Sequence, residues 1–206
     1  MSEPDQDRNR HSLEEFNASY ADQPPWDIGR PQPVFVAVAD AGGLRGHVLD
    51  AGCGTGEHAL MAAQRGFAAT GVDQAPAAIE IAQRKARERG LDVRFTVWDA
   101  LELGALGERY ETVLDSGLFH VFSDEHRARY VQSLGEATAP GGRYGMLCFS
   151  DLQPGDWGPR RVSQGEIEAS FADGWRIELL ERVVFDTNLD SGQVQAWHAQ
   201  IERVGR

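Results

Sequence analysis

The sequence predicts an α/β fold built on a doubly wound, seven-stranded sheet that is mostly parallel and ends in an antiparallel hairpin. From residue 46 onward, short apolar segments alternate with amphipathic segments of ten to fifteen residues, an alternation typical of β-α-β units. After residue 174 two strand-like segments follow each other across a short turn. Strands joined in this way pair antiparallel. Two helical segments precede the first strand.

The helical segments carry start and stop signals. Residues 12–21 have apolar side chains at spacings of three and four, behind a capping box made by Ser12 and Glu15. Gly66 and Gly90 follow two later helical segments and are typical C-terminal stops. We expect helices over residues 12–21, 34–43, 57–66, 76–90, 124–138 and 163–173.

Seven short apolar segments predict the strands. They cover residues 46–52, 67–73, 92–100, 111–117, 143–150, 175–186 and 193–204. We expect the first five to run parallel, with helices covering both faces. Residues 1–10 are polar and are predicted to be disordered. Residues 1–206 are then expected to form one domain, with an N-terminal cap over residues 11–43 and a core over residues 46–204.

The composition, with 41% hydrophobic and 25% charged residues among 206, is that of a folded globular protein. The formal charge of −12 disfavours nucleic acid or an anionic membrane as a partner. Cys53 and Cys148 are far apart in the sequence, so no metal site is expected. The chain shows no apolar signal segment and no membrane-spanning run, which predicts a cytoplasmic location. The oligomeric state is not predicted.

The first strand leads directly into a glycine-rich loop, D-A-G-C-G-T-G, at residues 50–56. Gly52, Gly54 and Gly56 let the backbone approach a ligand and turn sharply into the next helix. A dinucleotide fingerprint would need another glycine at position 57, which is a glutamate. The loop therefore predicts a nucleotide-like ligand that is bound in a different manner.

Acidic residues end the first three strands. Asp73, at the end of the second strand, is placed to accept hydrogen bonds from both hydroxyls of a ribose. Asp99 and the backbone N–H of Ala100, after the third strand, offer the pair of groups that an adenine edge needs. Each acid alone could be a strand-end cap. Together with Asp50 and the glycine loop, they favour a binding site.

These segments resemble the class I S-adenosylmethionine-dependent methyltransferases. The resemblance covers residues 46–204 and rests on VLDAGCGTG, GVDQAP, WDA, TVLDSGLFHVF and ATAPGGRYGMLCF. It implies a Rossmann-like seven-stranded fold and S-adenosylmethionine as the cofactor. It also implies that the cofactor is bound by Asp50, Gly52, Cys53, Gly54, His58, Asp73, Gln74, Asp99, Ala100, Asp115 and Ser116.

The proline-rich segment PPWDIGRPQP, residues 24–33, resembles a segment of the thiopurine, halide/thiol and tellurite-type branch of that family. In that branch the N-terminal region forms a helical lid. The resemblance implies that Trp26 contacts the cofactor and that Asp27, Gly29 and Arg30 face the cofactor or the substrate. Substrate contacts are expected from Tyr20, Arg30, Phe119, His120, Trp157 and Arg160, although Phe119 and Trp157 could equally be core residues and Arg160 a solvated surface residue.

Methyl transfer from a sulfonium is an in-line displacement, and it needs a general base only when the acceptor arrives protonated. His120 follows the fourth strand and is the candidate base or substrate contact; the alternative is a histidine that packs within a loop. The resemblance implies a small acceptor such as a thiol, a halide or a heteroatom of an aromatic ring. An N- or O-methyltransferase of a secondary metabolite stays open. A nicotinamide-dependent oxidoreductase and a non-catalytic cofactor-binding module are weaker alternatives.

Overall fold

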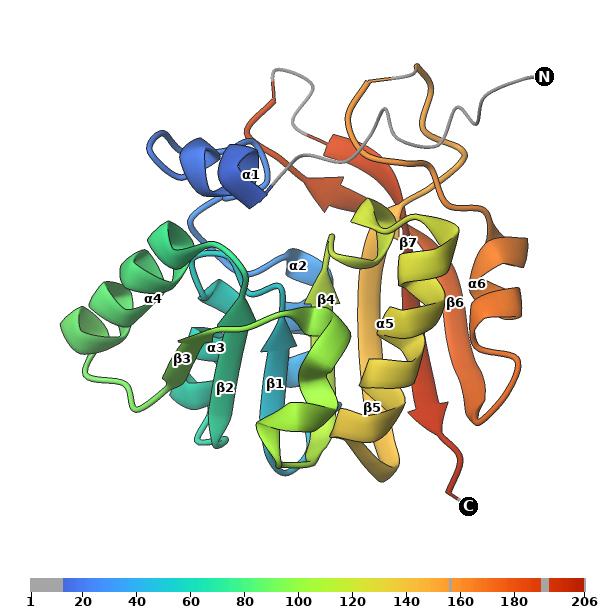
Figure 1. Cartoon of the computed structure of the whole chain (residues 1–206), viewed down its shortest axis with the longest axis horizontal. Coiled ribbons are helices and arrows are strands. Elements are labelled where there is room, and N and C mark those ends of the chain that lie inside the picture. Colours follow the sequence, from blue (N-terminus) through green and yellow to red (C-terminus); the bar gives the residue numbers. More distant parts are fainter. Residues whose placement is uncertain (1–12, 156, 190–192, 206) are drawn as a thin grey trace.

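The computed structural model describes residues 13–155, 157–189 and 193–205. The strands are β1 (Val48–Ala51), β2 (Ala69–Asp73), β3 (Arg94–Val97), β4 (Tyr110–Ser116), β5 (Thr138–Phe149), β6 (Trp175–Asp186) and β7 (Gln193–Arg203). They form one sheet in the order β3-β2-β1-β4-β5-β7-β6 (Figure 1). β1 to β5 pair parallel, whereas β7 is antiparallel to both β5 and β6. The predicted doubly wound sheet and its C-terminal hairpin are confirmed.

Helices cover both faces of the sheet (Figure 1). They are α1 (Leu13–Ser19), α2 (Pro33–Asp40), α3 (Glu57–Gln64), α4 (Pro76–Arg89), α5 (Asp124–Ala137) and α6 (Gln164–Ser170), with two short 3-10 helices, η1 (Ala100–Leu106) and η2 (Phe119–Val121). The six α-helices match the predicted segments, and η1 and η2 were not predicted. Ser12 of the predicted capping box and the predicted disordered tail over residues 1–10 lie outside the described residues.

Two hydrophobic cores hold the layers together. On one face, Phe35 of α2, Leu60 of α3 and Ile79 of α4 pack against the sheet. On the other face, Leu134 of α5 and Ile167 of α6 pack against β4, β5 and β7. Because successive strand residues point to opposite faces, each central strand contributes to both cores. Among the described residues, no helix has both the length and the apolar character needed to cross a bilayer.

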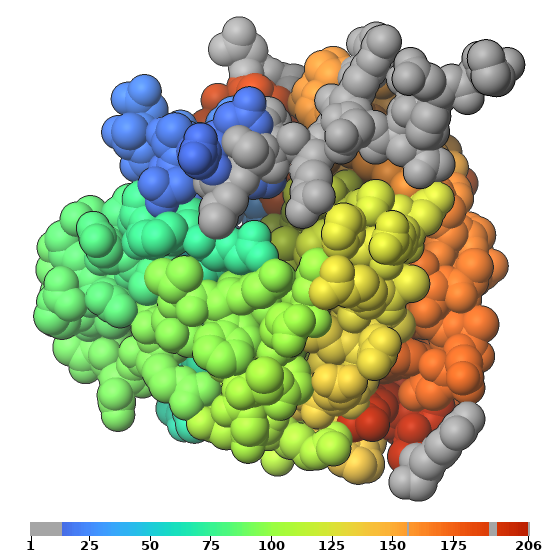
Figure 2. Space-filling view, viewed as in Figure 1, coloured from blue at the N-terminus to red at the C-terminus, as the bar shows by residue number. Residues whose placement is uncertain are grey.

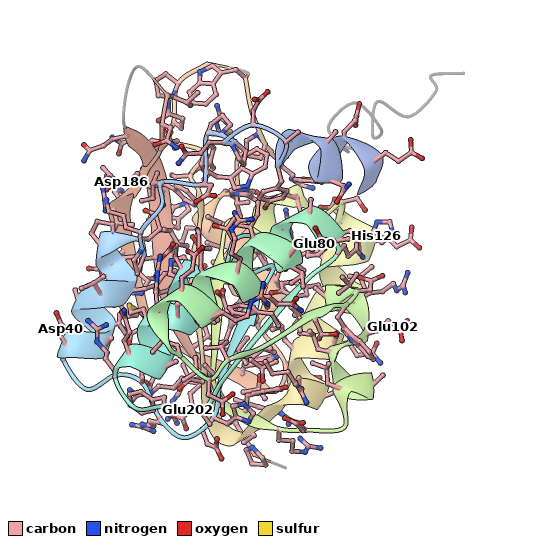
Figure 3. The ribbon with its side chains drawn as sticks, turned by 90° about the vertical axis from the view of Figure 1, so that its left-hand side faces the viewer. Asp40, Glu80, Glu102, His126, Asp186 and Glu202 are labelled. Atoms are coloured by element: carbon pink, nitrogen blue, oxygen red, sulfur yellow. The ribbon has the colours of Figure 1, made fainter. Side chains whose placement is uncertain are left out.

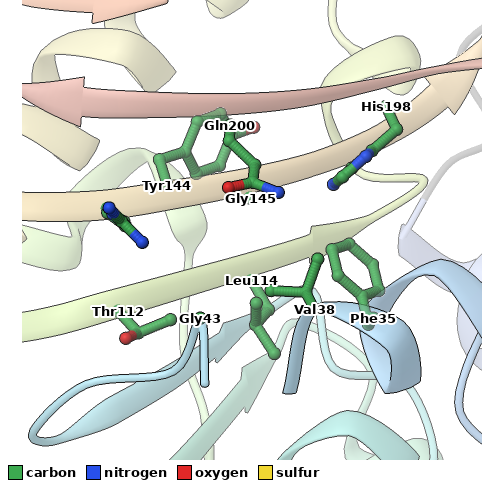
Figure 4. Close-up of a pocket in the computed structure, with 10 residues that line it drawn as sticks. Phe35, Val38, Gly43, Thr112, Leu114, Tyr144, Gly145, His198 and Gln200 are labelled. Carbon is green, nitrogen blue, oxygen red and sulfur yellow. The ribbon is translucent and has the colours of Figure 1, made fainter. Parts of the chain in front are cut away.

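A small cavity lies between α2 and the strands β4, β5 and β7 (Figure 4). Phe35 and Val38 line it from the helix, and Tyr144 and His198 from the strands. Its volume of about 20 Å³ is that of a single water molecule. The cavity is therefore a small gap in the packing of one core and is too small for a nucleotide-like ligand.

Candidate functional site

The glycine loop that follows β1 requires glycine at positions 52 and 54. The φ angles of Gly52 and Gly54 are +68° and +50°, in the left-handed region that other residues rarely adopt. A Cβ atom on Gly52 would lie 3.0 Å from Leu118, and one on Gly54 would lie 3.0 Å from the hydroxyl of Tyr20. The loop therefore lies directly beneath the N-terminal segment and beside the turn that follows β4.

Asp50 places a buried carboxylate under this loop. It is 1% exposed, and its Oδ2 accepts the N–H of Ala59 at 3.1 Å. Among the described residues, its Oδ1 has no hydrogen-bond partner. Burial, together with the negative charges of Asp73 and Asp115, raises the pKa of Asp50 to about 7. An unpaired buried oxygen in a negative surrounding suits a cationic group of a ligand.

His58 connects Asp50 to the N-terminal segment. Its Nε2 accepts the backbone N–H of Gln32 at 3.1 Å, which assigns the ring proton to Nδ1. Nδ1 lies 3.9 Å from Oδ1 of Asp50. Burial lowers the pKa of His58 to about 4, so the ring is neutral at pH 7. The side chain thus lies between the N-terminal segment and Asp50, and its predicted contact with the cofactor stays a prediction.

Asp73 and Asp99 lie at the ends of β2 and β3. Asp73 accepts the N–H groups of Gly54 and Ala75, both at 2.9 Å, and burial raises its pKa. Asp99 caps η1 by accepting the N–H of Leu101 at 2.9 Å. Beside it lies an open hollow of about 580 Å³, lined by Gln74, Val97, Trp98, Asp99, Glu102 and Ala105. The structure therefore brings Gln74 and Asp99 together at one hollow, and their contact with the cofactor stays a prediction.

Asp115 is held by four donors from the protein itself. Its carboxylate is fully buried and accepts N–H groups of Leu118 at 2.8 Å and Phe119 at 3.3 Å, and hydroxyls of Tyr130 at 2.9 Å and Tyr144 at 2.7 Å. These bonds engage both carboxylate oxygens, and the predicted place of Asp115 near the sulfonium stays a prediction. Asp115 holds the turn after β4, and the half-buried Ser116 points to the opposite face of the strand.

His120 is anchored by that turn at the edge of an aromatic wall, which we define as His120, Phe149, Trp157 and Phe185. The imidazole centroid lies 4.9 Å from Phe149 and 6.4 Å from Phe185, and the Trp157 ring lies 6.2 Å from Phe149. Nδ1 of His120 accepts the backbone N–H of Phe149 at 2.9 Å. Burial lowers the pKa of His120 to about 3, assisted by the positive charges of Arg161 and Arg127.

Sequence reasoning missed three residues around this wall. Phe149 is the last residue of β5, and Phe185 lies next to the end of β6. The strand pattern was the signal in the sequence that could have placed both residues at the sheet edge where the site lies. The guanidinium carbon of Arg161 lies 5.5 Å from the Phe149 ring centroid and 5.2 Å from that of Trp157. Arg161 also donates to the carbonyls of Trp157 and Pro159 at 2.8 Å. It therefore fixes the loop that carries Trp157.

Two predicted substrate residues are occupied elsewhere. Phe119 is fully buried, stacks on Phe171 with 5.8 Å between ring centroids, and lies under the guanidinium of Arg127. Arg160 binds Asp124 at 2.6 Å and also pairs with Glu166. Phe119 is therefore a core residue, and Arg160 ties its loop to α5 and α6. The expectation of a substrate contact fits neither residue.

The N-terminal segment docks on the site at two places. Above the glycine loop, Thr55 donates to Oδ2 of Asp27 at 2.9 Å, and Trp26 donates to the Tyr20 hydroxyl at 3.2 Å. At the end of β6, Arg30 binds Asp186 at 2.7 Å. Figure 3 shows Asp186 at the same end of the molecule as α1, and Figure 2 shows the N-terminal segment lying against α4. The segment thus contacts the glycine loop and the end of β6, and its action as a lid stays a prediction.

Removing the Asp27 carboxylate tests this docking. We expect Asp27→Ala to lower the free energy of unfolding by only about 1 kcal/mol, because the bond to Thr55 is partly exposed. We expect protease cleavage between residues 20 and 32 to become several-fold faster, since the lid opens more often. Asp40→Ala is the matched control, because Asp40 forms an exposed ion pair with Arg65 away from the loop. Equal cleavage of both variants would contradict the lid contact.

Comparisons with known proteins agree on one family. Residues 48–142 match the family model described as "Methyltransferase domain". The chain is 41% identical over 161 residues to a 2-heptyl-1-hydroxyquinolin-4(1H)-one methyltransferase of Mycobacteroides abscessus, covering 77% of this chain and 71% of that protein. It is 27% identical over 152 residues to a probable thiol methyltransferase 2 of Arabidopsis thaliana, covering 70% and 65%.

Solved structures give the same result. One structure, from work on the conversion of a disulfide bond into a thioacetal group during echinomycin biosynthesis, superposes with a TM-score of 0.85 and 37% identity. The match covers 94% of this chain and 93% of that one. Its coverage includes most of the N-terminal segment as well as the sheet, so the likeness extends beyond the glycine loop.

Proposed function

The chain belongs to the class I S-adenosylmethionine-dependent methyltransferases, and we propose that it methylates an oxygen or sulfur atom of a small aromatic or heteroaromatic molecule. The observation that carries the proposal is the aromatic wall, in which the exposed Trp157 extends the buried His120, Phe149 and Phe185 at the carboxyl edge of the sheet. Flat rings pack well against such side chains. The hydroxyquinolone and thiol named for the two relatives support acceptors of this kind.

S-adenosylmethionine is the cofactor of the family, and the residues present fit it. We assign Oδ1 of Asp50 to the α-ammonium of the methionine moiety, because it is a buried acceptor that lacks a partner among the described residues. Gly52 and Gly54 give the loop the left-handed turns with which its backbone would approach the methionine chain. Gln74 and Asp99 in the open hollow would contact the adenosine, and Asp73 would accept the ribose hydroxyls with its remaining lone pairs.

The bound cofactor supplies an activated methyl group, and the chain's own residues then orient the acceptor and exclude water. The aromatic wall would hold the acceptor ring, and the lid would cover the loop through Tyr20 and Trp26. Burial raises the pKa of Tyr20 well above its ordinary value, so its hydroxyl stays protonated. A small acceptor and no nucleic-acid partner agree with the formal charge of −12.

Cofactor affinity should depend on pH through Asp50. Its pKa of about 7 means that the carboxyl is largely protonated at pH 6 and ionised at pH 8. The ammonium needs the ionised form, so we expect affinity to rise about tenfold per pH unit below pH 7 and to level off above it. Isothermal titration calorimetry with S-adenosylhomocysteine between pH 5.5 and 8.5 would measure this. A flat profile would contradict the assignment of Asp50.

The proposed function is tested with methyl-labelled S-adenosylmethionine and a panel of acceptors. The panel contains hydroxyquinolines, phenols, thiophenols, a thiopurine, iodide and heterocyclic amines. We expect methyl transfer to ring-bound oxygen or sulfur. Transfer only to iodide or to ring nitrogen would overturn the proposal. Tight cofactor binding without transfer to any acceptor would favour the non-catalytic module.

The nicotinamide alternative lacks structural support. Glu57, which stands at the position of the missing glycine, is bound by Lys85 at 2.9 Å and by Arg89 at 2.8 Å. These ion pairs lower the pKa of Glu57 and tie the start of α3 to α4. Glu57, which replaces the last glycine of the dinucleotide fingerprint, thus helps to fix the end of this loop.

A further inference from the structure

The hydrogen bond to Nδ1 determines what His120 can do. The N–H of Phe149 donates to Nδ1, so the neutral ring carries its proton on Nε2. Among the described residues, no hydrogen bond is made by Nε2. The Nε2–H group of the imidazole is therefore available as a hydrogen-bond donor. A general base would need a free lone pair on that nitrogen.

The charges around His120 oppose its protonation. Phe149 of β5 and Phe185 of β6 pack against the ring, and Gly117 lies beside its Cε1. The charged groups that act on it are Arg161, from the loop after β5, and Arg127, from α5. Both are cationic, and Arg127 is 4% exposed and pairs with Glu166 at 3.3 Å and with Asp124 at 3.8 Å. A proton on His120 would add a positive charge beside these two guanidinium groups, which disfavours the imidazolium.

We propose that the acceptor binds as an anion, as the ionised form of an acidic hydroxyl or thiol on an aromatic or heteroaromatic ring, and that Nε2–H of His120 donates a hydrogen bond to it. This inference rests on the proposed function and narrows its substrate class. The donor and Arg161 lower the pKa of the bound acceptor and fix the reacting atom near the loop. His120 then contacts the substrate as a donor and not as a base.

The reaction balances without an enzymic base. An electron pair of the acceptor anion forms the new bond to the methyl carbon. The bond between that carbon and the sulfonium breaks, and its electron pair stays on sulfur. One anion and one sulfonium cation become a neutral methyl ether or thioether and a neutral thioether. The acceptor's proton is lost to solvent before binding, so no proton has to leave the lidded site.

The test measures kcat/KM against pH for the wild-type enzyme with phenols of graded acidity, from pentafluorophenol through 4-nitrophenol to 4-methylphenol. We expect a rising limb whose midpoint follows each acceptor's own pKa. At pH 7 the least acidic acceptor should react at least about 100-fold more slowly than the most acidic one. S-adenosylmethionine is kept saturating at every pH, so that titration of Asp50 adds no limb of its own. A limb at one fixed pH for all acceptors would then reveal an enzymic base and overturn the inference. No transfer to any phenol or thiophenol would instead contradict the proposed function.

Two variants of His120 separate a donor from a base. Glutamine keeps an N–H donor but accepts no proton near pH 7, and phenylalanine keeps only ring volume. With 4-nitrophenolate, we expect His120→Gln to retain activity within about tenfold and His120→Phe to raise KM or lower kcat by at least about 100-fold. Cofactor affinity, measured by calorimetry, should be unchanged in both. Equal loss in the two variants with intact cofactor binding would overturn the donor role.

Discussion

Replacing Asp115 with alanine is expected to lower the free energy of unfolding by about 3–5 kcal/mol, the largest single-residue effect on stability that we predict. The carboxylate is fully buried and accepts from Leu118, Phe119, Tyr130 and Tyr144. Alanine would leave these buried donors without an acceptor and would open a small void. Urea unfolding monitored by tryptophan fluorescence would measure the change.

Asp115→Asn is the matched control. Burial raises the pKa of Asp115 to about 6, so folding makes the charged form less favourable than it is in water. The amide oxygen would still accept the backbone N–H groups, and the tyrosine hydroxyls could rotate to accept from the amide nitrogen. We therefore expect Asp115→Asn to lose less than half as much stability as Asp115→Ala. Equal losses would show that charge, and not the set of hydrogen bonds, holds the turn.

The role of Asp115 illustrates what the sequence could not reveal. The strand pattern placed it correctly at the end of β4, but the tyrosines that bind it come from α5 and β5. Such contacts between distant segments leave no local signal. The short helix η2 was missed for the same reason. Asp115 accepts the N–H groups of Leu118 and Phe119 at its start, and the local sequence carries no strong helix signal.

The cofactor side of the site was more predictable than the acceptor side. The glycines of the loop and the acids at the strand ends are local features, since a sharp turn demands glycine and parallel strands end at one sheet edge. Around the acceptor, by contrast, three-dimensional pairing decides the role of each residue. Arg160 is taken by Asp124 and Glu166, whereas the neighbouring Arg161 reaches the aromatic wall. The sequence around these two adjacent arginines gives no signal that would distinguish their roles.

Replacing Asp50 with asparagine is expected to weaken cofactor binding by about 100-fold, the largest effect on ligand affinity that we predict. The variant removes the negative charge opposite the proposed ammonium position, while its side chain keeps the same size. It should not unfold the protein. The pKa of Asp50 in the folded state, about 7, lies above the ordinary value of 3.8. Ionisation of Asp50 therefore lowers the stability of the folded state as the pH rises through this range, and asparagine removes that loss.

The choice of ligand makes the Asp50 experiment specific. 5′-Methylthioadenosine contains the adenosine and a sulfur atom but lacks the amino-acid end of the cofactor. We expect calorimetry to show unchanged affinity of Asp50→Asn for this ligand, a large loss for S-adenosylhomocysteine, and a pH profile for the latter that is flat between pH 6 and 8. If both ligands lose affinity equally, Asp50 acts by shaping the glycine loop through its bond to Ala59. In that case the carboxylate would be a structural support for the loop and the ammonium would be bound elsewhere.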